Sequence, residues 1–393
     1  MFFKKCEYDR IFLIVLDSVG CGEAIDSEKF NDKGAFTLKH AMEAVKENNY
    51  TNFQRLGIQN LVYNYNYPTI SYYTKANEIS NGKDTLTGHL EMMGIETKIP
   101  FKTFTETGFP LELISELEKQ CGRKVIGNCN ASGTEIIERL GKEHMETGSI
   151  IVYTSADSVL QIAAHENIVP LDELYKICEI ARNLTLKEEW KVGRIIARPF
   201  IGEVGNFTRT SNRRDFALNP SGVTVLDKLK KKKYDVISIG KIADIFNDCG
   251  ITQKIHIEDN TDGIRQIVRQ THNSFKGLCF ANLNDFDSKY GHRRNPVGYA
   301  NALLEVDNAI PHILGHLTNK DLLIITADHG NDPTFRGTDH TREKTPVIIY
   351  SPKFKEVSKL EELSTFADIG ATIADNFNVK PPVIGNSFLK KLK

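Results

Sequence analysis

The chain has 393 residues, of which 40% are hydrophobic and 26% are charged, an ordinary composition for a globular protein in water. This length exceeds what one hydrophobic core usually supports, so about two domains are expected. The formal net charge of −1 excludes a global field that would favour nucleic acid or an anionic membrane. The basic run 228–233, broken only by Leu229, is typical of the solvated end of a helix, where the dipole favours cations.

The cysteines and the first apolar run bear on the compartment. Seven cysteines are scattered without zinc-binding or redox spacing, which favours a reducing cytosol. The apolar run 11–16 is far shorter than the roughly 18 residues needed to span a bilayer. Asp17 follows that run directly, which is not typical of a signal peptide. The sequence therefore predicts a cytoplasmic protein that does not enter a membrane.

Five short apolar runs are typical of strands that are buried on both faces. They are Ile11–Leu16, Asp235–Ile239, Leu278–Leu283, Leu322–Thr326 and Thr345–Tyr350. Helical spacing of apolar residues lies at 303–317 and 366–377. Strands that alternate with helices predict an α/β fold with a mostly parallel sheet sandwiched by helices. In such a sheet, the polar residues that follow the strands meet at one edge, where ligands bind.

The middle of the chain, residues 101–218, has a different pattern. Short strands are expected at 149–153 and 194–200, and helices are expected at 111–120, 134–140 and 171–184. We interpret this segment as an α+β domain inserted into the first domain and acting as a cap. Residues 1–100 and 219–393 would then together form the core domain.

Carboxylate and imidazole side chains follow three of the predicted strands. They are Asp17, then Asp287 and His292, then Asp328 and His329, with Asp339 and His340 on the next loop. One such residue alone would more often be a surface residue or a helix cap, but the recurrence favours metal binding. This mixture of ligands suits zinc or manganese better than magnesium or calcium alone. The ligands exceed what one ion needs, so two metals are expected.

The segment 81–89, Asn-Gly-Lys-Asp-Thr-Leu-Thr-Gly-His, precedes a predicted helix that continues through Met93. Thr85 would lie at or near the N-terminus of this helix, where free N–H groups and the dipole favour an anion. Beside a divalent metal, its hydroxyl could act as a nucleophile. Taken alone, the segment is equally compatible with Asp84, Thr85 or Thr87 serving only as a helix cap, which is the commoner role.

Several motifs together resemble the alkaline phosphatase superfamily and, within it, the bacterial phosphopentomutase family. The shared stretches are 16–20, 82–89, 153–162, 285–287 with 291–294, 326–332 and 337–343. Asp-His-Gly at 328–330 is specific only to the superfamily. Thr-Ser-Ala-Asp-Ser-Val at 154–159 and Gly-Thr-Asp-His-Thr-Arg-Glu at 337–343 are much more specific to the family.

This resemblance implies an isomerase that interconverts the 1- and 5-phosphates of ribose or deoxyribose through phosphothreonine at Thr85 and a 1,5-bisphosphate. One metal would be held by Asp17, Asp328 and His329, and the other by Asp287, His292 and His340. Manganese would be preferred, with other divalent metals, magnesium among them, as alternatives. Glucose 1,6-bisphosphate would activate the enzyme, and its role would be nucleoside catabolism.

The resemblance also implies substrate contacts and partners. Ser155 and Asp157 would contact sugar hydroxyls, and Arg194, Arg209 and Lys241 would contact phosphate, a task that suits Arg and Lys. Small phosphosugars would be the partners, with neither nucleic acid nor membrane involved.

Three alternatives stay open. A phosphatase or sulfatase on the same core would share the metal ligands, although a sulfatase uses a modified Cys or Ser as nucleophile. A cofactor-independent phosphoglycerate mutase would use serine and a different inserted domain. A regulator that binds metal or phosphosugar without catalysis would keep the fold but would not need Thr85.

Overall fold

A computed structural model describes residues 6–155 and 158–393, and the chain divides into two compact units. The core unit comprises Met1–Ile99 and Pro220–Lys393, and the inserted unit comprises Pro100–Asn219. This division falls one residue from the boundaries expected from the sequence. Within the described ranges, none of the helices is long and apolar enough to cross a membrane.

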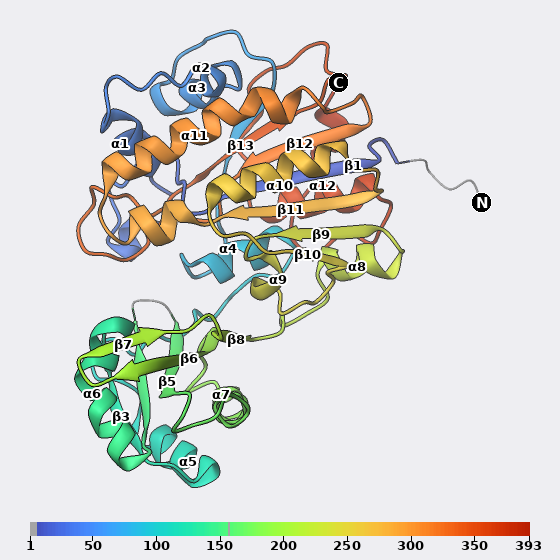
Figure 1. Ribbon diagram of the computed structural model, residues 1–393. Coiled ribbons are helices and arrows are strands. Elements are labelled where there is room, and N and C mark those ends of the chain that lie inside the picture. The colour runs from blue at the N-terminus through green and yellow to red at the C-terminus, as the bar shows by residue number, and fades with distance from the viewer. Residues whose placement is uncertain (1–5, 156–157) are drawn as a thin grey trace. The chain divides into compact units, whose positions relative to one another are not determined.

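The core unit is built on a seven-stranded sheet (Figure 1). The strand order is β10 (Gln253–Ile255), β9 (Asp235–Ile239), β11 (Gly277–Leu283), β1 (Arg10–Leu16), β12 (Asp321–Thr326), β13 (Thr345–Tyr350) and β2 (Tyr72–Ala76). The first five strands in this order are parallel, and β13 runs antiparallel to β12 and to β2. The mostly parallel sheet is confirmed. The edge strands β2 and β10 escaped the sequence analysis because they are short and mix polar with apolar residues.

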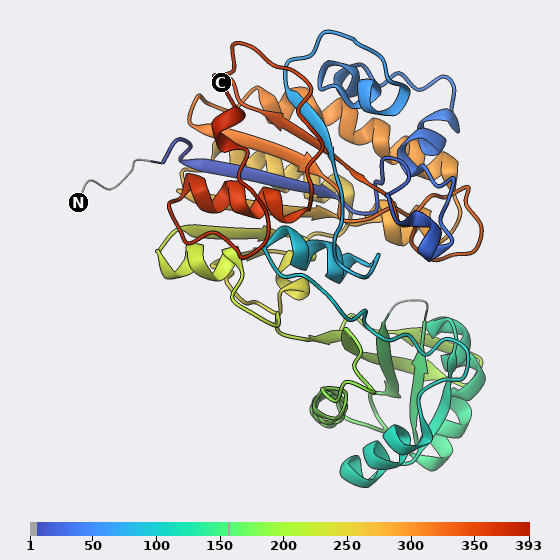
Figure 2. The ribbon, with the colours of Figure 1, turned by 180° about the vertical axis from the view of Figure 1, so that it is seen from behind.

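Helices cover both faces of this sheet (Figures 1 and 2). One face carries α1 (Thr37–Glu43), α2 (Thr51–Arg55), α3 (Ile58–Tyr63), α10 (Asn260–His272) and α11 (Pro296–Leu314). The other carries α4 (Thr85–Met92), α8 (Val225–Lys231), α9 (Ile242–Ile245) and α12 (Ala367–Asn376). Ser27–Phe30 and Leu389–Lys391 form short 3₁₀ turns, and Phe286–Gly291 forms a π-helical turn. Because both faces are covered, β11 and β12 are buried at every residue, which explains their continuous apolar runs.

The inserted unit has a mixed sheet of its own. Its strands are β3 (Val125–Asn130), β4 (Ile150–Thr154), β5 (Val159–His165), β6 (Arg194–Glu203) and β7 (Asn206–Arg209) in that order, and β8 (Arg214–Ala217) also pairs with β6. Two apolar clusters lie against this sheet, one with α5 (Leu111–Cys121) and α7 (Leu171–Leu184), the other with α6 (Gly133–Thr147). Successive residues of β4, such as Val152 and Tyr153, point to opposite faces of the sheet and belong to different clusters. Helices therefore cover both faces of this sheet too.

The register of the core sheet brings three loops to one edge. Leu16 at the end of β1 lies opposite Leu283 at the end of β11, and Val15 lies opposite Thr326 at the end of β12. Parallel strands in register end at the same edge, so the residues that follow them are neighbours in space. The polar residues that are far apart in the sequence therefore meet beyond the ends of β1, β11 and β12.

Candidate metal centre

Two groups of buried carboxylate and imidazole side chains lie at this edge of the core sheet. The first consists of Asp17, Asp328 and His329, and the second consists of Asp287, His329 and His340. Within each group the potential ligand atoms all lie within 4.8 Å of one another. His329 belongs to both groups, so the two potential metal positions are adjacent.

His292, which the resemblance assigns to the second metal, stands beside the second group. Its Nε2 lies 3.2 Å from Oδ2 of Asp287 and 3.1 Å from Nε2 of His340. Its Nδ1 lies 2.7 Å from the carbonyl oxygen of Thr338, to which a protonated Nδ1 donates. That tautomer leaves the lone pair of Nε2 facing Asp287, which is the orientation a metal ligand needs.

Two carboxylate oxygens of the first group fit a cation. Oδ1 of Asp17 and Oδ2 of Asp328 are buried and have no hydrogen-bond partner within the described residues. They lie 3.5 and 3.3 Å from Nε2 of His329, whose Nδ1 lies 3.0 Å from the carbonyl oxygen of Gly330. Burying ionised oxygens is costly unless they are paired or bind a metal, so the residues present suit a divalent ion.

The pKa shifts in the two groups also indicate strong interactions between carboxylates and imidazoles. Burial alone would raise the pKa of Asp287, but His292 and His340 hold it well below its usual range. Burial alone would lower the pKa of His329, but Asp328 and Asp17 raise it well above its usual range. The raised pKa favours the protonated imidazole of His329, and an incoming cation would compete with that proton.

Amide side chains orient the carboxylates, and the sequence analysis assigned them no role. Asn282 and Asn284 donate to Oδ2 of Asp17 at 2.9 and 3.2 Å. Asn331 donates to Oδ1 of Asp287 at 2.8 Å. The one signal in the sequence was Asn282 itself, a polar residue inside the apolar run of β11.

Helix α4 presents Thr85 to both groups. Asp84 is the N-cap, and its carboxylate accepts from the backbone N–H of Thr87 at 3.1 Å and from the Thr87 hydroxyl at 2.6 Å. Capping therefore falls to Asp84, which leaves the Thr85 hydroxyl available for another role. Oγ1 of Thr85 lies 3.1 Å from Nε2 of His329, the ring that the two groups share. An anion on this hydroxyl would also meet the free N–H groups of the first helical turn.

The close approach of α4 depends on Gly88, which lies nearly one turn after Thr85. A Cβ at this position would lie 2.1 Å from the backbone oxygen of Asp328, so only glycine allows this contact. His89 also links α4 to Asp328. Its Nδ1 lies 2.8 Å from the carbonyl oxygen of Thr85 and 3.2 Å from Oδ2 of Asp328. The sequence analysis gave His89 no role of its own, although it ends the stretch 82–89 that carries part of the family resemblance.

The loop before α4 is held by charged side chains. The buried guanidinium of Arg342 donates to Glu78, to Asp26 and to the carbonyl oxygen of Gly82. Lys83 pairs with Oδ2 of Asp339 at 3.1 Å. Asp339, one of the acidic residues noted after the fourth predicted strand, thus faces this lysine and lies outside both metal-binding groups.

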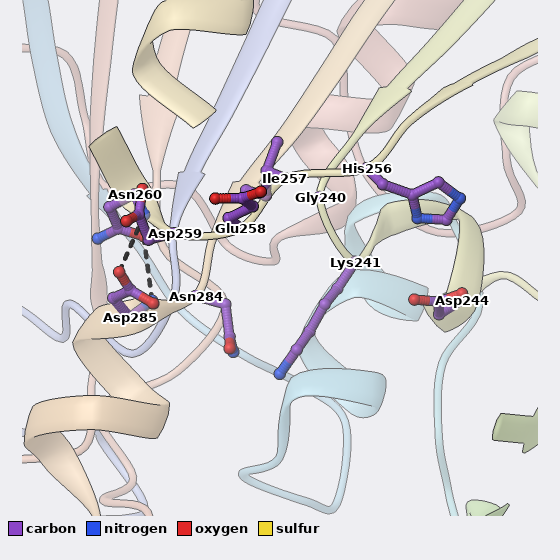
Figure 3. Close-up of a pocket in the computed structure, with 10 residues that line it drawn as sticks. All are labelled: Gly240, Lys241, Asp244, His256, Ile257, Glu258, Asp259, Asn260, Asn284 and Asp285. Carbon is purple, nitrogen blue, oxygen red and sulfur yellow. Dashed lines mark hydrogen bonds between the residues drawn. The ribbon is translucent and has the colours of Figure 1, made fainter. Parts of the chain in front are cut away.

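Lys241 lines a cavity of about 190 Å³ next to these groups (Figure 3). Its side chain points toward Asn284, which lines the same cavity and also donates to Asp17. Asn284 therefore lies between the cavity and Asp17 of the first metal-binding group. A phosphate that contacts Lys241 there would lie close to the candidate metals.

The remaining predicted contact residues lie in the inserted unit, except that Asp157 lies outside the described residues. Ser155 follows β4, and Arg194 begins β6 with its Nη1 3.8 Å from Oδ2 of Asp215. The hydroxyl of Thr154 donates to the carbonyl oxygen of Val159, and Val159 is the partner of Arg194 across the sheet. Ser155 and Arg194 thus lie at the same end of this sheet.

Arg209 lies on β7, beside the N-terminus of α6. The Cβ position of Gly133, the first residue of α6, is 3.2 Å from Nη1 of Arg209 and 2.6 Å from the hydroxyl oxygen of Tyr153. That hydroxyl is fully buried and has no hydrogen-bond partner in the part of the chain described. An arginine, an unpaired phenol and the start of a 15-residue helix converge here, which suits an anion.

One family model matches most of the chain, and several solved structures are similar to it. A model of the metalloenzyme superfamily matches residues 9–381. The fold is similar to the PH0037 protein from Pyrococcus horikoshii, with 15% identity, a TM-score of 0.49 and coverage of 95% of this chain and 98% of that one. It is also similar to Leishmania mexicana phosphoglycerate mutase at low cobalt concentration, with 10% identity, a TM-score of 0.49 and 98% of both chains covered.

A third similar structure is a Vibrio parahaemolyticus protein of the alkaline phosphatase superfamily, with 11% identity and a TM-score of 0.42. The alignment covers 99% of this chain and 72% of that protein. The family match over residues 9–381 includes every residue of both metal-binding groups and Thr85. The chain therefore belongs to the metalloenzyme superfamily, and its α/β core unit holds two adjacent groups of side chains that could bind metal ions.

Proposed function

We propose that the protein is a phosphopentomutase, which interconverts the 1- and 5-phosphates of ribose or deoxyribose. The observation that carries the proposal is the position of Thr85, whose hydroxyl lies 3.1 Å from the imidazole that both metal-binding groups share. A hydroxyl placed there, at a helix N-terminus, is suited to carry a phosphoryl group. The choice of a pentose rests on the family motifs at 154–159 and 337–343.

The proposal divides the metal ligands as the resemblance implies. Asp17, Asp328 and His329 would hold one divalent ion, and Asp287, His292 and His340 would hold the other. Metal ions bound there would stabilise negative charge on the attacking and leaving oxygens and lower the pKa of the attacking hydroxyl. Manganese is the proposed metal, because mixed carboxylate and imidazole ligands suit it.

The reaction proceeds through phosphothreonine. The free hydroxyl of the pentose phosphate attacks phosphorus on phospho-Thr85 in line, loses its proton, and the bond between phosphorus and Oγ1 of Thr85 breaks. The proton of the sugar hydroxyl ends on Oγ1 of Thr85, so the products are the pentose 1,5-bisphosphate and the free threonine hydroxyl, and the same proton passes to the leaving sugar oxygen in the second transfer. The bisphosphate then turns around, and Oγ1 of Thr85 attacks its other phosphorus, which releases the isomeric monophosphate and restores phospho-Thr85.

The residues outside the metal-binding groups would position the sugar phosphate. We assign Lys241, at the cavity that shares Asn284 with the metal-binding group, to a phosphate. Arg194 and Arg209 of the inserted unit would contact the phosphate from the cap, and Ser155 with Asp157 would contact sugar hydroxyls. The buried hydroxyl of Tyr153 has no hydrogen-bond partner among the described residues, and its place beside Arg209 supports an anion there.

The resting enzyme must keep its phosphoryl group from water. Hydrolysis of phospho-Thr85 would leave an inactive form, which a sugar bisphosphate such as glucose 1,6-bisphosphate would phosphorylate again. The cap would lower the rate of this hydrolysis by excluding water from the site. A requirement for priming by a bisphosphate is therefore part of the proposal.

A metal-dependent phosphatase is the second candidate, because the same ligands and Thr85 would serve it equally well. The two activities differ only in the acceptor, which is a sugar hydroxyl in one and water in the other. A sulfatase fits less well, since its nucleophile is a modified Cys or Ser and Thr85 occupies that place.

Phosphorus NMR separates these candidates. The protein is incubated with manganese, glucose 1,6-bisphosphate and ribose 5-phosphate, and the signals of ribose 1-phosphate and inorganic phosphate are followed over time. A mutase gives ribose 1-phosphate with little inorganic phosphate. Release of inorganic phosphate without the isomer would establish the phosphatase instead, and deoxyribose 5-phosphate in a parallel sample reports the sugar preference.

A further inference from the structure

A second cavity, a groove of about 1160 Å³, lies in the core unit and shares no residue with the metal-binding groups. One wall is α8 with the residues around it, and the other is the segment 379–383, which follows α12. In Figure 2, α8 lies beside this C-terminal segment. The basic run 228–233, which the sequence analysis interpreted as a solvated helix end, thus borders an apolar groove.

Contacts fix how the two walls run relative to each other. At the C-terminal end of α8, the ammonium group of Lys232 donates to the carbonyl oxygen of Asn378 at 3.1 Å. One turn earlier, Lys228 donates to the carbonyl oxygen of Pro381 at 3.3 Å. Pro382 in turn lies against Gly94, near the start of α8. The walls are therefore antiparallel, and the groove follows the length of α8.

The two ends of the groove differ in character. Near the start of α8, the lining is apolar and includes Ile95, Val223 and Val383, of which the two valines have exposed fractions of 67% and 102%. Near the end of α8, the lining consists of the exposed Lys231, Lys232 and Lys233. Exposed valines at one end and lysines at the other make the groove amphipathic along its length.

The positive charges of the groove outnumber its acidic groups. In the described part of the chain, Lys231, Lys233 and Lys380 form no ion pair. Asp227 is the one acidic residue in the lining, and its carboxylate is bound to the backbone N–H and the hydroxyl of Thr224 in a capping box. Partial burial, together with Lys380, lowers the pKa of Lys228. An anion would relieve this repulsion.

We propose that this groove binds an anionic amphiphile, a small molecule with a phosphate or carboxylate head and an apolar chain or ring. The head would lie among Lys231, Lys232 and Lys233, and the apolar part would cover Ile95, Val223 and Val383. Small-molecule sites usually enclose about 300–1,000 Å³, so a groove of about 1160 Å³ has room for both parts. An acidic peptide would call for cations along the whole groove, and a membrane would call for a convex apolar face.

The test uses dodecyl phosphate below its micelle concentration as the probe, with binding to the full-length protein measured by isothermal titration calorimetry. We expect saturable binding to one site. The double substitution Lys231→Glu with Lys233→Glu should weaken binding at least about tenfold, because each reversal places a like charge near the head. The same charge change at the exposed Lys33 and Lys46, as Lys33→Glu with Lys46→Glu, should have no such effect.

A second pair of variants tests the apolar end. Val223→Asp should weaken binding about as much, whereas Ile25→Asp, at another residue with an exposed fraction of 87%, should not. Thermal unfolding shows that each variant is folded. Equal binding by the groove and control variants, or equal affinity for neutral dodecyl maltoside, would overturn the proposal. So would binding confined to vesicles of anionic lipid or to an acidic peptide, because each would identify a different occupant.

Discussion

The core unit and the inserted unit position their polar residues in different ways. In the core unit, the carboxylates and imidazoles follow parallel strands that end at one edge, so Asp17, Asp287 and Asp328 meet as a consequence of strand register. In the inserted unit, the strands are mixed in direction and the polar residues lie on strands and at a helix start. Arg194 faces Asp215, whereas Arg209 lies beside Tyr153 and the start of α6.

This difference bears on what each unit contributes. The core unit has a buried arrangement in which amide side chains orient the carboxylates, as suits residues that hold metals and a nucleophile. The inserted unit offers cations and, within its described residues, a buried hydroxyl without a hydrogen-bond partner, as suits a surface that binds a charged small molecule. Variants at Thr85 and the metal ligands of the core unit should therefore affect chemistry and metal content, and variants in the inserted unit should affect substrate affinity.

The largest effect is expected at Thr85. Thr85→Ala should reduce turnover by on the order of 10⁴-fold, because the phosphoryl carrier is lost. Thr87→Ala is the matched control in the same helix, since it removes a hydroxyl that only bonds the capping Asp84. It should retain activity within a few-fold and lose about 1 kcal/mol of stability. Ribose 5-phosphate turnover and thermal unfolding measure both effects. Full activity in the Thr85 variant would contradict its role as carrier.

The next largest effect is expected at the metal-binding groups. Asp17→Asn should lower metal affinity and activity at least about 100-fold, because a buried ligand and its charge are lost. Metal content after dialysis, measured by mass spectrometry of the elements, should fall from two ions to one. Asp339→Asn is the matched control, because Asp339 faces Lys83 and lies outside both groups. Loss of a metal from that variant would contradict the ligand assignment.

Metal binding should also release protons. Since the carboxylates raise the pKa of His329, the metal-free protein holds a proton there that the ion displaces. Metal affinity should therefore increase as pH rises through the pKa of His329. Titration of the metal-free protein with manganese in weakly buffered solution measures the protons released. Uptake of protons on binding, or affinity that does not change with pH, would be inconsistent with this arrangement.

A smaller effect is expected at Gly88, where α4 packs against the backbone of Asp328. Gly88→Ala should push α4 away from the backbone oxygen of Asp328, at a cost of about 1–3 kcal/mol of stability. Displacing Thr85 by about 1 Å should lower kcat on the order of 100-fold while both metals stay bound. Gly315→Ala, at the end of α11, is the control with full activity expected. Equal kcat in the two variants would show that the helix contact does not position Thr85.

The smallest effect is expected in the inserted unit. Arg209→Lys and Tyr153→Phe should each raise KM for ribose 5-phosphate about tenfold, through loss of a donor to an anion. Metal content should not change. Arg139→Lys, at an exposed position on α6, serves as the control. A loss of metal, or an unchanged KM in both variants, would break the proposed division of roles between the units.

The sequence predicted the core unit better than the inserted unit, for a physical reason. Strands buried on both faces must be continuously apolar, so β1, β9, β11, β12 and β13 were visible as apolar runs. The short edge strands β2 and β10 carry no such pattern. In the inserted unit, β3, β5, β7 and β8 were not anticipated, and α6 continues to Thr147, beyond the expected end at residue 140. Successive residues along its strands pack into two different apolar clusters, and this weakens the apolar pattern by which a strand is recognised in the sequence.

The candidate site could likewise be predicted only in part. Asp and His residues after strands were visible in the sequence because their chemistry is distinctive. Asn284, Asn331 and His89 were not assigned roles, because what they do depends on the partners that folding brings to them. The choice between Asp84 and Thr85 as the cap could be made only from the backbone geometry at the start of α4.

The most direct test of the central claim is mass spectrometry of the intact and digested protein, before and after incubation with manganese and glucose 1,6-bisphosphate. Thr85, at the imidazole shared by both groups, should gain one phosphoryl group, and ribose 5-phosphate should then remove it as the 1,5-bisphosphate forms. A phosphoryl group on another residue, or none on Thr85 in a metal-loaded protein that turns over substrate, would contradict the account.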